Sequence, residues 1–163
     1  MNRYVIAVYV ENKYGVLTRV TGLFMRKGFN IDALTVGETD DPAFSRITIT
    51  LKGDEYTREQ LINQVKKLHN VKRVALLDEG NTVERELMLI KVPNTPENRQ
   101  EVMAAADVYR ARVIDYKTNT MCIEVTGDPS KINAFIGVMK PMGIVEMCRT
   151  GVVALERGDC VLV

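Results

Sequence analysis

Two short turns near the N-terminus contain the groups best suited to chemistry. The first turn, Glu11–Leu17, holds Asn12 and Gly15 and separates an apolar strand pattern from an amphipathic helix pattern. The second turn, Lys27–Ile31, ends that helix with a glycine and introduces Asn30. Backbone N–H groups at a helix start bind carboxylates, and carboxamides hydrogen-bond to ammonium or carboxylate groups. The two turns therefore indicate a site that grips a small zwitterion without reacting with it.

The helix start is the half of the site expected to hold a carboxylate. The N–H groups around Gly15, Val16 and Leu17 point out of the first helical turn, and the helix dipole adds to their pull on an anion. Gly15 permits a close backbone approach that a Cβ would block. Charge-assisted hydrogen bonds of this kind contribute about 1.5–3 kcal/mol each.

The remaining candidate residues would complete the site. Asn12 and Asn30 can bond the ligand's ammonium or carboxylate group, while Leu17 and Ile31 line a pocket for its side chain. Because Asn30 opens an expected edge strand, it can come from a neighbouring copy. A purely structural interpretation stays open, in which Asn12 is a turn or capping residue and Gly28 with Asn30 is a helix stop.

Catalytic and metal-binding interpretations have little support in the sequence. The sole histidine, His69, falls at the expected end of a helix, where a cation near the negative dipole end is an ordinary feature. The cysteines Cys122, Cys148 and Cys160 form no Cys-x-x-Cys pair and fall in apolar patterns, so we expect buried thiols rather than metal ligands. No phosphate-binding glycine loop occurs. We therefore predict neither catalytic nor metal-binding residues.

Composition excludes several other classes. The 163 residues are 46% hydrophobic and 26% charged, as in a globular protein. The net charge is +1, so no overall field attracts nucleic acid or an anionic membrane. No apolar run approaches the roughly 20 residues of a membrane span, and no signal segment opens the sequence. Three widely spaced cysteines fit a reducing compartment, so we expect a cytoplasmic protein.

The first half reads as strand, helix, strand, strand, helix, strand. Its first strand is a nearly continuous apolar run, which predicts burial on both faces. A capping-box pattern at Thr57–Gln60 predicts the second helix start. The four expected strands are Tyr4–Val10, Ile31–Thr39, Arg46–Leu51 and Val71–Leu77.

The second half repeats this order of elements. Thr95–Pro96 and Asp128–Pro129 each predict a helix start. The expected strands are Glu86–Val92, Val113–Tyr116, Met121–Val125 and Ile144–Cys148, with a tail strand over Gly151–Leu155. We predict an α+β protein of two ferredoxin-like βαββαβ sandwiches in tandem: a first domain at 1–78, a linker at 79–82 and a second domain at 83–163.

The strand that begins at Ile31 looks like an unprotected sheet edge. It carries Ala33, Leu34 and Val36, with neither proline nor lysine to block pairing. We predict that it pairs with its twin in another copy across a twofold axis. The alternative is that a loop or the second domain covers this edge.

The motifs resemble a known family. From the first strand through Glu11–Leu17 to Gly28–Ile31, the sequence is similar to an ACT domain, the small-molecule sensing module of amino-acid metabolism. Together with Thr39–Pro42, Ser45–Thr48, Val83–Leu89 and Arg149–Gly158, the whole chain resembles the small regulatory subunit of acetolactate synthase, also called acetohydroxyacid synthase.

This resemblance implies a function and a partner. The partner is a large catalytic subunit carrying thiamine diphosphate, Mg²⁺ and FAD, while this chain binds no cofactor. The small subunit of that family activates the catalytic subunit in branched-chain amino-acid biosynthesis and confers feedback inhibition, usually by valine. One methylene discriminates by only about 1–3 kcal/mol, so leucine and isoleucine are expected to bind as well. A free-standing ACT-type sensor acting on another enzyme or regulator is the alternative.

Overall fold

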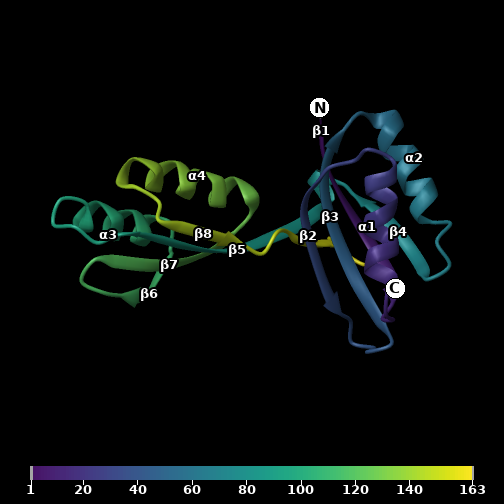
Figure 1. Ribbon diagram of the computed structural model, residues 1–163, viewed down its shortest axis with the longest axis horizontal. Coiled ribbons are helices and arrows are strands. Elements are labelled where there is room, and N and C mark those ends of the chain that lie inside the picture. Colours follow the sequence, from purple (N-terminus) through teal and green to yellow (C-terminus); the bar gives the residue numbers. More distant parts are fainter. Residues whose placement is uncertain (1, 163) are drawn as a thin grey trace. The chain divides into compact units, whose positions relative to one another are not determined.

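The chain forms two compact units. The computed structural model describes residues 2–162, apart from the side chain of Thr57. One unit consists of Met1–Val83 together with Gly151–Val163, and the other of Glu84–Thr150. Both units have the expected α+β architecture (Figure 1). The boundary differs from the expected one, because residues 151–163 belong with the first unit and not with the second.

The first unit has a four-stranded antiparallel sheet in the order β2-β3-β1-β4, with two helices on one face (Figure 1). The expected order of elements is confirmed. They are β1 (Asn2–Glu11), α1 (Val16–Arg26), β2 (Ile31–Glu38), β3 (Phe44–Gly53), α2 (Glu55–Val65) and β4 (Val71–Leu77).

Strand β1 lies in the middle of the first unit and is buried on both faces, as its apolar run predicts. Ile6 and Val8 face the helices and are fully buried beside Phe24 of α1. Val5 and Ala7 face the other way and are also buried. The sheet therefore needs a cover on the face that the helices leave free.

The C-terminal tail supplies that cover. Val152, Ala154 and Leu162 pack with Val5 and Ala7 in one apolar cluster. Strand β9 (Val153–Glu156) pairs with β5 (Thr82–Pro93). Burial of these apolar side chains explains why the tail joins the first unit rather than the second.

A half-buried arginine also anchors the tail. Arg46 of β3 donates from Nη2 to the carbonyl oxygen of Ala154 at 2.8 Å. Burial lowers the pKa of the Arg46 guanidinium, and the nearby carboxylate of Glu156 partly offsets that effect. The tail is thus held by both apolar packing and a charged donor.

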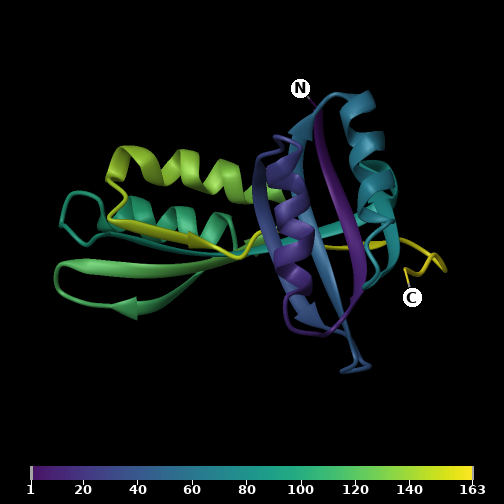
Figure 2. The same ribbon diagram turned by 45° about the vertical axis from the view of Figure 1, so that its right-hand side comes forward.

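The second unit repeats the fold, with a sheet path β6-β7-β5-β8 and both helices on one face (Figure 2). Its core contains Met88, Ile90, Ile123 and Phe135, all fully buried. Besides β5, its elements are α3 (Arg99–Val108), β6 (Arg112–Tyr116), β7 (Thr120–Gly127), α4 (Pro129–Met139) and β8 (Glu146–Arg149), with short 3-10 turns η1 (Glu79–Asn81) and η2 (Lys140–Met142). Within the described residues, no helix is both long and apolar enough to cross a membrane.

Two of the three predicted helix starts are wrong in detail. Asp128 caps α4 as expected, since its Oδ1 accepts from the Lys131 N–H at 2.9 Å. Helix α3 begins only at Arg99, because Thr95 and Asn98 first bond to each other in a turn. Helix α2 begins at Glu55, so residues 57–60 lie inside it; the Thr57 side chain itself is outside the described part.

Candidate functional site

The turn between β1 and α1 presents an open helix N-terminus. Gly15 is the N-cap residue, with a left-handed backbone (φ 78°) that favours glycine, and no side chain caps the helix. The first turn of α1 contains no acidic residue. The sequence predicts a free N–H at Val16. In the structure this N–H donates to the Lys13 carbonyl at 3.3 Å, so it is already used. The backbone N–H groups of Leu17 and of the residue after it have no acceptor within the helix, so they can hold a carboxylate.

Asn12 fixes this turn in place. Its N–H donates to the Ala43 carbonyl at 2.7 Å, and its Nδ2 donates to Pro42 O and to Glu38 Oε1, both at 3.0 Å. The expected structural role of Asn12 is therefore real. These bonds connect the β1–α1 turn to the end of β2 and to the β2–β3 turn.

A polar network behind the turn was not found from the sequence. Glu11 accepts from Lys72 Nζ at 2.6 Å, Asn70 Nδ2 at 2.8 Å and Lys13 Nζ at 3.0 Å. Arg19 of α1 donates to Asn70 Oδ1 at 2.6 Å. The hydrogen bonds from Lys72, Asn70 and Lys13 lower the pKa of Glu11 to about 2. No motif marks Asn70, which lies far from Glu11 in sequence and meets it only through the β1–β4 pairing.

Of the two apolar side chains at the helix start, only one is accessible. Val16 is buried in the core of the first unit, whereas 41% of Leu17 is exposed. Val16 can thus contribute only backbone groups, and Leu17 can contact a ligand. Tyr14 is fully exposed at the tip of the turn.

Asn30 and Ile31 lie at the opposite end of the sheet. Glu11 pairs with Phe44, while Ile31 pairs with Leu51, seven residues further along β3. At about 3.3 Å per residue this separates the two halves of the candidate site by roughly 23 Å. Within one chain the structure therefore brings Asn12, Gly15, Val16 and Leu17 together. Asn30 and Ile31 lie next to each other but far from those four residues.

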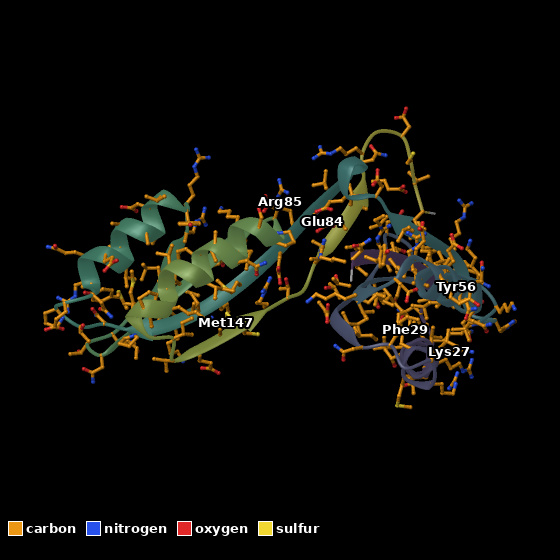
Figure 3. The ribbon with its side chains drawn as sticks, turned by 90° about the horizontal axis from the view of Figure 1, so that it is seen from above. Lys27, Phe29, Tyr56, Glu84, Arg85 and Met147 are labelled. Atoms are coloured by element: carbon orange, nitrogen blue, oxygen red, sulfur yellow. The ribbon has the colours of Figure 1, made fainter. Side chains whose placement is uncertain are left out.

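The helix end beside Asn30 has the expected stop. Gly28 has φ 74°, and Phe29 donates its N–H to the Phe24 carbonyl at 2.9 Å. Figure 3 labels Lys27 and Phe29 at this end of α1. Asn30 is exposed and donates from Nδ2 to Asp32 Oδ1 at 3.3 Å, while Ile31 packs partly on the core.

The second unit contains an equivalent turn with different side-chain contacts. Asn94 follows β5 as Asn12 follows β1, and it likewise bonds the strand–strand turn, through its N–H to Asn119 O at 2.9 Å and its Nδ2 to Lys117 O at 2.7 Å. Here, however, Arg99 at the helix start donates to Asn94 Oδ1 at 2.8 Å. Neither helix start has a side-chain cap, but the first turn of α3 contains the acidic residue Glu101, whereas that of α1 contains none.

The thiols are more accessible than expected. Cys148 and Cys160 are exposed, and Cys122 is half-buried; all three are free. The prediction of buried thiols is wrong for the first two. Cys148 pairs with Leu89 on the outer strand β8, on the face that does not carry the helices, and Cys160 lies in the tail beyond β9.

The fold and the open turn define the first unit as an ACT domain. Residues 6–73 match the family model described as "AHAS small subunit-like ACT domain", and residues 85–158 match that of the "Small subunit of acetolactate synthase". The chain belongs to the acetolactate synthase small-subunit family. The resemblance stated from the sequence and the predicted fold of two tandem ferredoxin-like domains are both confirmed.

Relatives along the whole chain support this assignment. The probable acetolactate synthase small subunit of Archaeoglobus fulgidus is 48% identical over 157 residues, covering 96% of this chain and 98% of that protein. The isozyme 3 small subunit of Salmonella typhimurium is 41% identical over 161 residues, covering 98% and 99%. The crystal structure of the Thermotoga maritima small subunit has a TM-score of 0.89 at 40% identity, covering 98% of this chain and all of that one. A small subunit of this enzyme accompanies a larger catalytic subunit and is not the catalyst alone.

Proposed function

We propose that this chain is the regulatory subunit of acetolactate synthase and binds a branched-chain amino acid, valine, between the ACT domains of two copies. The observation that carries the proposal is that α1 starts at Gly15 without a side-chain cap and has no acidic residue in its first turn. The hydrogen bonds of Asn12 hold this turn in place. A carboxylate there replaces the missing cap and is attracted by the helix dipole.

A second copy resolves the separation of the two half-sites. Strand β2 is an edge of its sheet, and antiparallel pairing of two β2 strands puts the start of one opposite the end of the other. The end of β2 is Glu38, whose Oε1 bonds Asn12 at 3.0 Å. Asn30 and Ile31 of a second copy would then lie beside the Asn12–Leu17 turn of the first. The dimer is part of the proposed site.

Regulation follows if the ligand favours one arrangement of the two ACT domains. The catalytic subunit, which we propose carries thiamine diphosphate, Mg²⁺ and FAD, is activated by association with this chain and inhibited when the effector is bound. The effector changes catalysis only to the extent that its affinity differs between the two arrangements. The free thiols are in keeping with function in the cytoplasm.

Calorimetric titration of the chain with L-valine, followed by assay of the reconstituted enzyme, tests the proposal. We expect saturable heat, a higher melting temperature in millimolar valine, and inhibition of the holoenzyme over the same concentration range. Absence of both heat and thermal shift would remove valine as the effector. Leucine and isoleucine serve as comparisons, because the pocket is expected to distinguish them only weakly.

The family assignment also weighs against a free-standing sensor. The second unit and the Arg149–Gly158 segment match the small-subunit model over residues 85–158, a part of the chain that an isolated ACT sensor does not require. Co-purification with a thiamine-dependent catalytic chain distinguishes the two functions.

A further inference from the structure

The chain passes between its two units at residues 83–84 and again at residues 150–151. The outgoing passage lies within β5, where Figure 3 labels Glu84 and Arg85. The second passage belongs to the return segment, which we define as Arg149–Ala154. Each end of this segment is fixed within a different unit, and the contacts at each end differ in kind.

On the side of the second unit, the return segment is held by polar bonds. Arg149 donates from Nε to Glu86 Oε1 at 2.8 Å and from Nη2 to Glu86 Oε2 at 2.7 Å, and the Glu86 side chain is almost fully buried. Thr150 and Leu87 exchange three further bonds. Thr150 donates its N–H to Leu87 O at 3.0 Å and its Oγ1 hydroxyl to the same oxygen at 3.3 Å, and Leu87 donates its N–H to Thr150 Oγ1 at 3.1 Å. Bidentate pairs of this type fix orientation as well as distance.

On the side of the first unit, the return segment lies directly against β2. Gly151 is buried and has φ 78°. A Cβ at this position would be 3.0 Å from Thr35 Oγ1 and 3.3 Å from the Cβ of Ala33, so the segment and the strand are too close for any side chain between them. Val152 and Ala154 continue the contact by packing on β1.

We propose that the return segment transmits effector binding from β2 to the second unit. This inference rests on the proposed function, in which Asn30 and Ile31 at the start of β2 contact the effector. A displacement of β2 changes the surface on which Gly151 packs. The neighbouring Thr150 and Arg149 are fixed to β5, so the displacement reaches the second unit through the chain itself.

The central test is Gly151→Ala, with Gly158→Ala as its control. Gly158 also lies in the tail and has φ 71°, but a Cβ there would meet no atom within 4 Å. Both variants therefore strain the backbone, and only Gly151→Ala pushes the return segment away from β2. We expect Gly151→Ala to bind L-valine with a Kd within about twofold of that of the unchanged chain. Allosteric coupling between two sites is usually about 5–150-fold, and we expect the fold-inhibition of the reconstituted holoenzyme by valine to fall below about twofold in this variant.

A second variant loosens the segment without adding bulk. Arg46→Met keeps a long side chain on β3 but removes the hydrogen bond to Ala154 O. Because Arg46 is partly desolvated and its Nε has no hydrogen-bond partner among the described residues, the substitution is expected to fold. It should likewise retain valine binding and lose part of the inhibition.

Each outcome decides a different claim. Binding without inhibition in Gly151→Ala and Arg46→Met, with normal inhibition in Gly158→Ala, supports transmission by the return segment. Inhibition unchanged in both test variants overturns it, as does loss of valine binding in both, since the segment would then only support the site. If the unchanged chain fails to bind L-valine, the proposed effector function is itself wrong and the inference falls with it.

Discussion

Arg149 holds both carboxylate oxygens of Glu86, with donor–acceptor distances of 2.8 and 2.7 Å, and also donates from Nη1 to Asn133 Oδ1 at 3.1 Å. The hydrogen bonds that Arg149 donates to the Glu86 carboxylate raise the pKa of the Arg149 guanidinium above its ordinary value. This pair fixes the last strand of the second unit to its central strand.

Replacing one partner of the Arg149–Glu86 pair should lower the free energy of unfolding more than replacing both partners. Arg149→Met leaves the buried Glu86 carboxylate without its main partner, and we expect a loss of about 2–4 kcal/mol of unfolding free energy. The double variant with Glu86→Met should recover part of that loss. Urea unfolding of the two single variants and the double variant measures the coupling; strictly additive effects would contradict it.

Gly15→Asp should abolish the effector response. The substitution introduces a side chain at φ 78° and a negative charge where the ligand carboxylate is expected. A Cβ at Gly15 meets no atom within 4 Å, so the fold should survive with a loss of about 1–2 kcal/mol from backbone strain.

Gly143→Asp is the matched control for that experiment. Gly143 has φ 86° and lies in the second unit, where a Cβ would make only an ordinary 3.6 Å contact with Pro93. It should lose at least as much stability, because its backbone (φ 86°, ψ 126°) admits a side chain less readily than that of Gly15 (φ 78°, ψ −4°), and it should keep valine inhibition. A Gly15→Asp holoenzyme that valine still inhibits would show that the site is elsewhere.

Glu11 should make the first unit sensitive to acid. Its pKa is lowered from 4.5 to about 2, chiefly by Lys72 and then by Asn70 and Lys13, so its contribution to stability is complete above pH 4.5 and is lost as the pH falls toward 2. Glu11→Gln should flatten the dependence of unfolding free energy on pH in this window. Glu101→Gln, at an exposed position on α3, controls for the change of net charge. Equal slopes for the two variants would refute the assignment to Glu11.

Leu162→Ala should destabilise the first unit. Leu162 is 7% exposed and packs in the cluster of Val5, Ala7 and Leu77. Removal of a buried leucine side chain costs about 2–5 kcal/mol, whereas Val161→Ala, at a side chain that is 67% exposed, should cost less than about 0.5 kcal/mol. Denaturant melts of both variants compare these values, and equal midpoints would contradict the packing of the tail.

Val36→Lys should weaken dimerisation. Val36 is 43% exposed on the edge strand β2, and a lysine there opposes pairing with a second strand. We expect the dimer dissociation constant to rise at least about tenfold, equivalent to roughly 1.4 kcal/mol. Sedimentation analysis against Val108→Lys, a similar change at an exposed position on α3, measures the effect. An unchanged dimer would exclude the β2 edge as the interface.

The sequence was most informative where local rules act. The apolar run of β1 predicts burial on both faces, and Val5 and Ile6 are indeed both buried. Asp128 predicts a helix start because its side chain reaches an N–H only three residues away. Such features depend on neighbours in the chain, which the sequence displays directly.

It was least informative where distant segments meet. Leu162 and Val5 belong to one cluster although they lie at opposite ends of the chain, and no periodic pattern connects them. The same holds for Asn70, which orders the Glu11 turn through a sheet pairing. In the candidate site, the glycine start of α1 could be predicted, whereas the bonds that fix it could not.

The placement of the tail has a consequence for synthesis on the ribosome. Strand β1 is translated before the residues that cover its outer face, which follow roughly 7–30 s later at 5–20 residues per second. All residues of the second unit are available before the first unit can close. A chain cut short before Gly151 would expose the apolar face of Val5 and Ala7, so the ACT domain is finished only after the whole second unit and the tail have been translated.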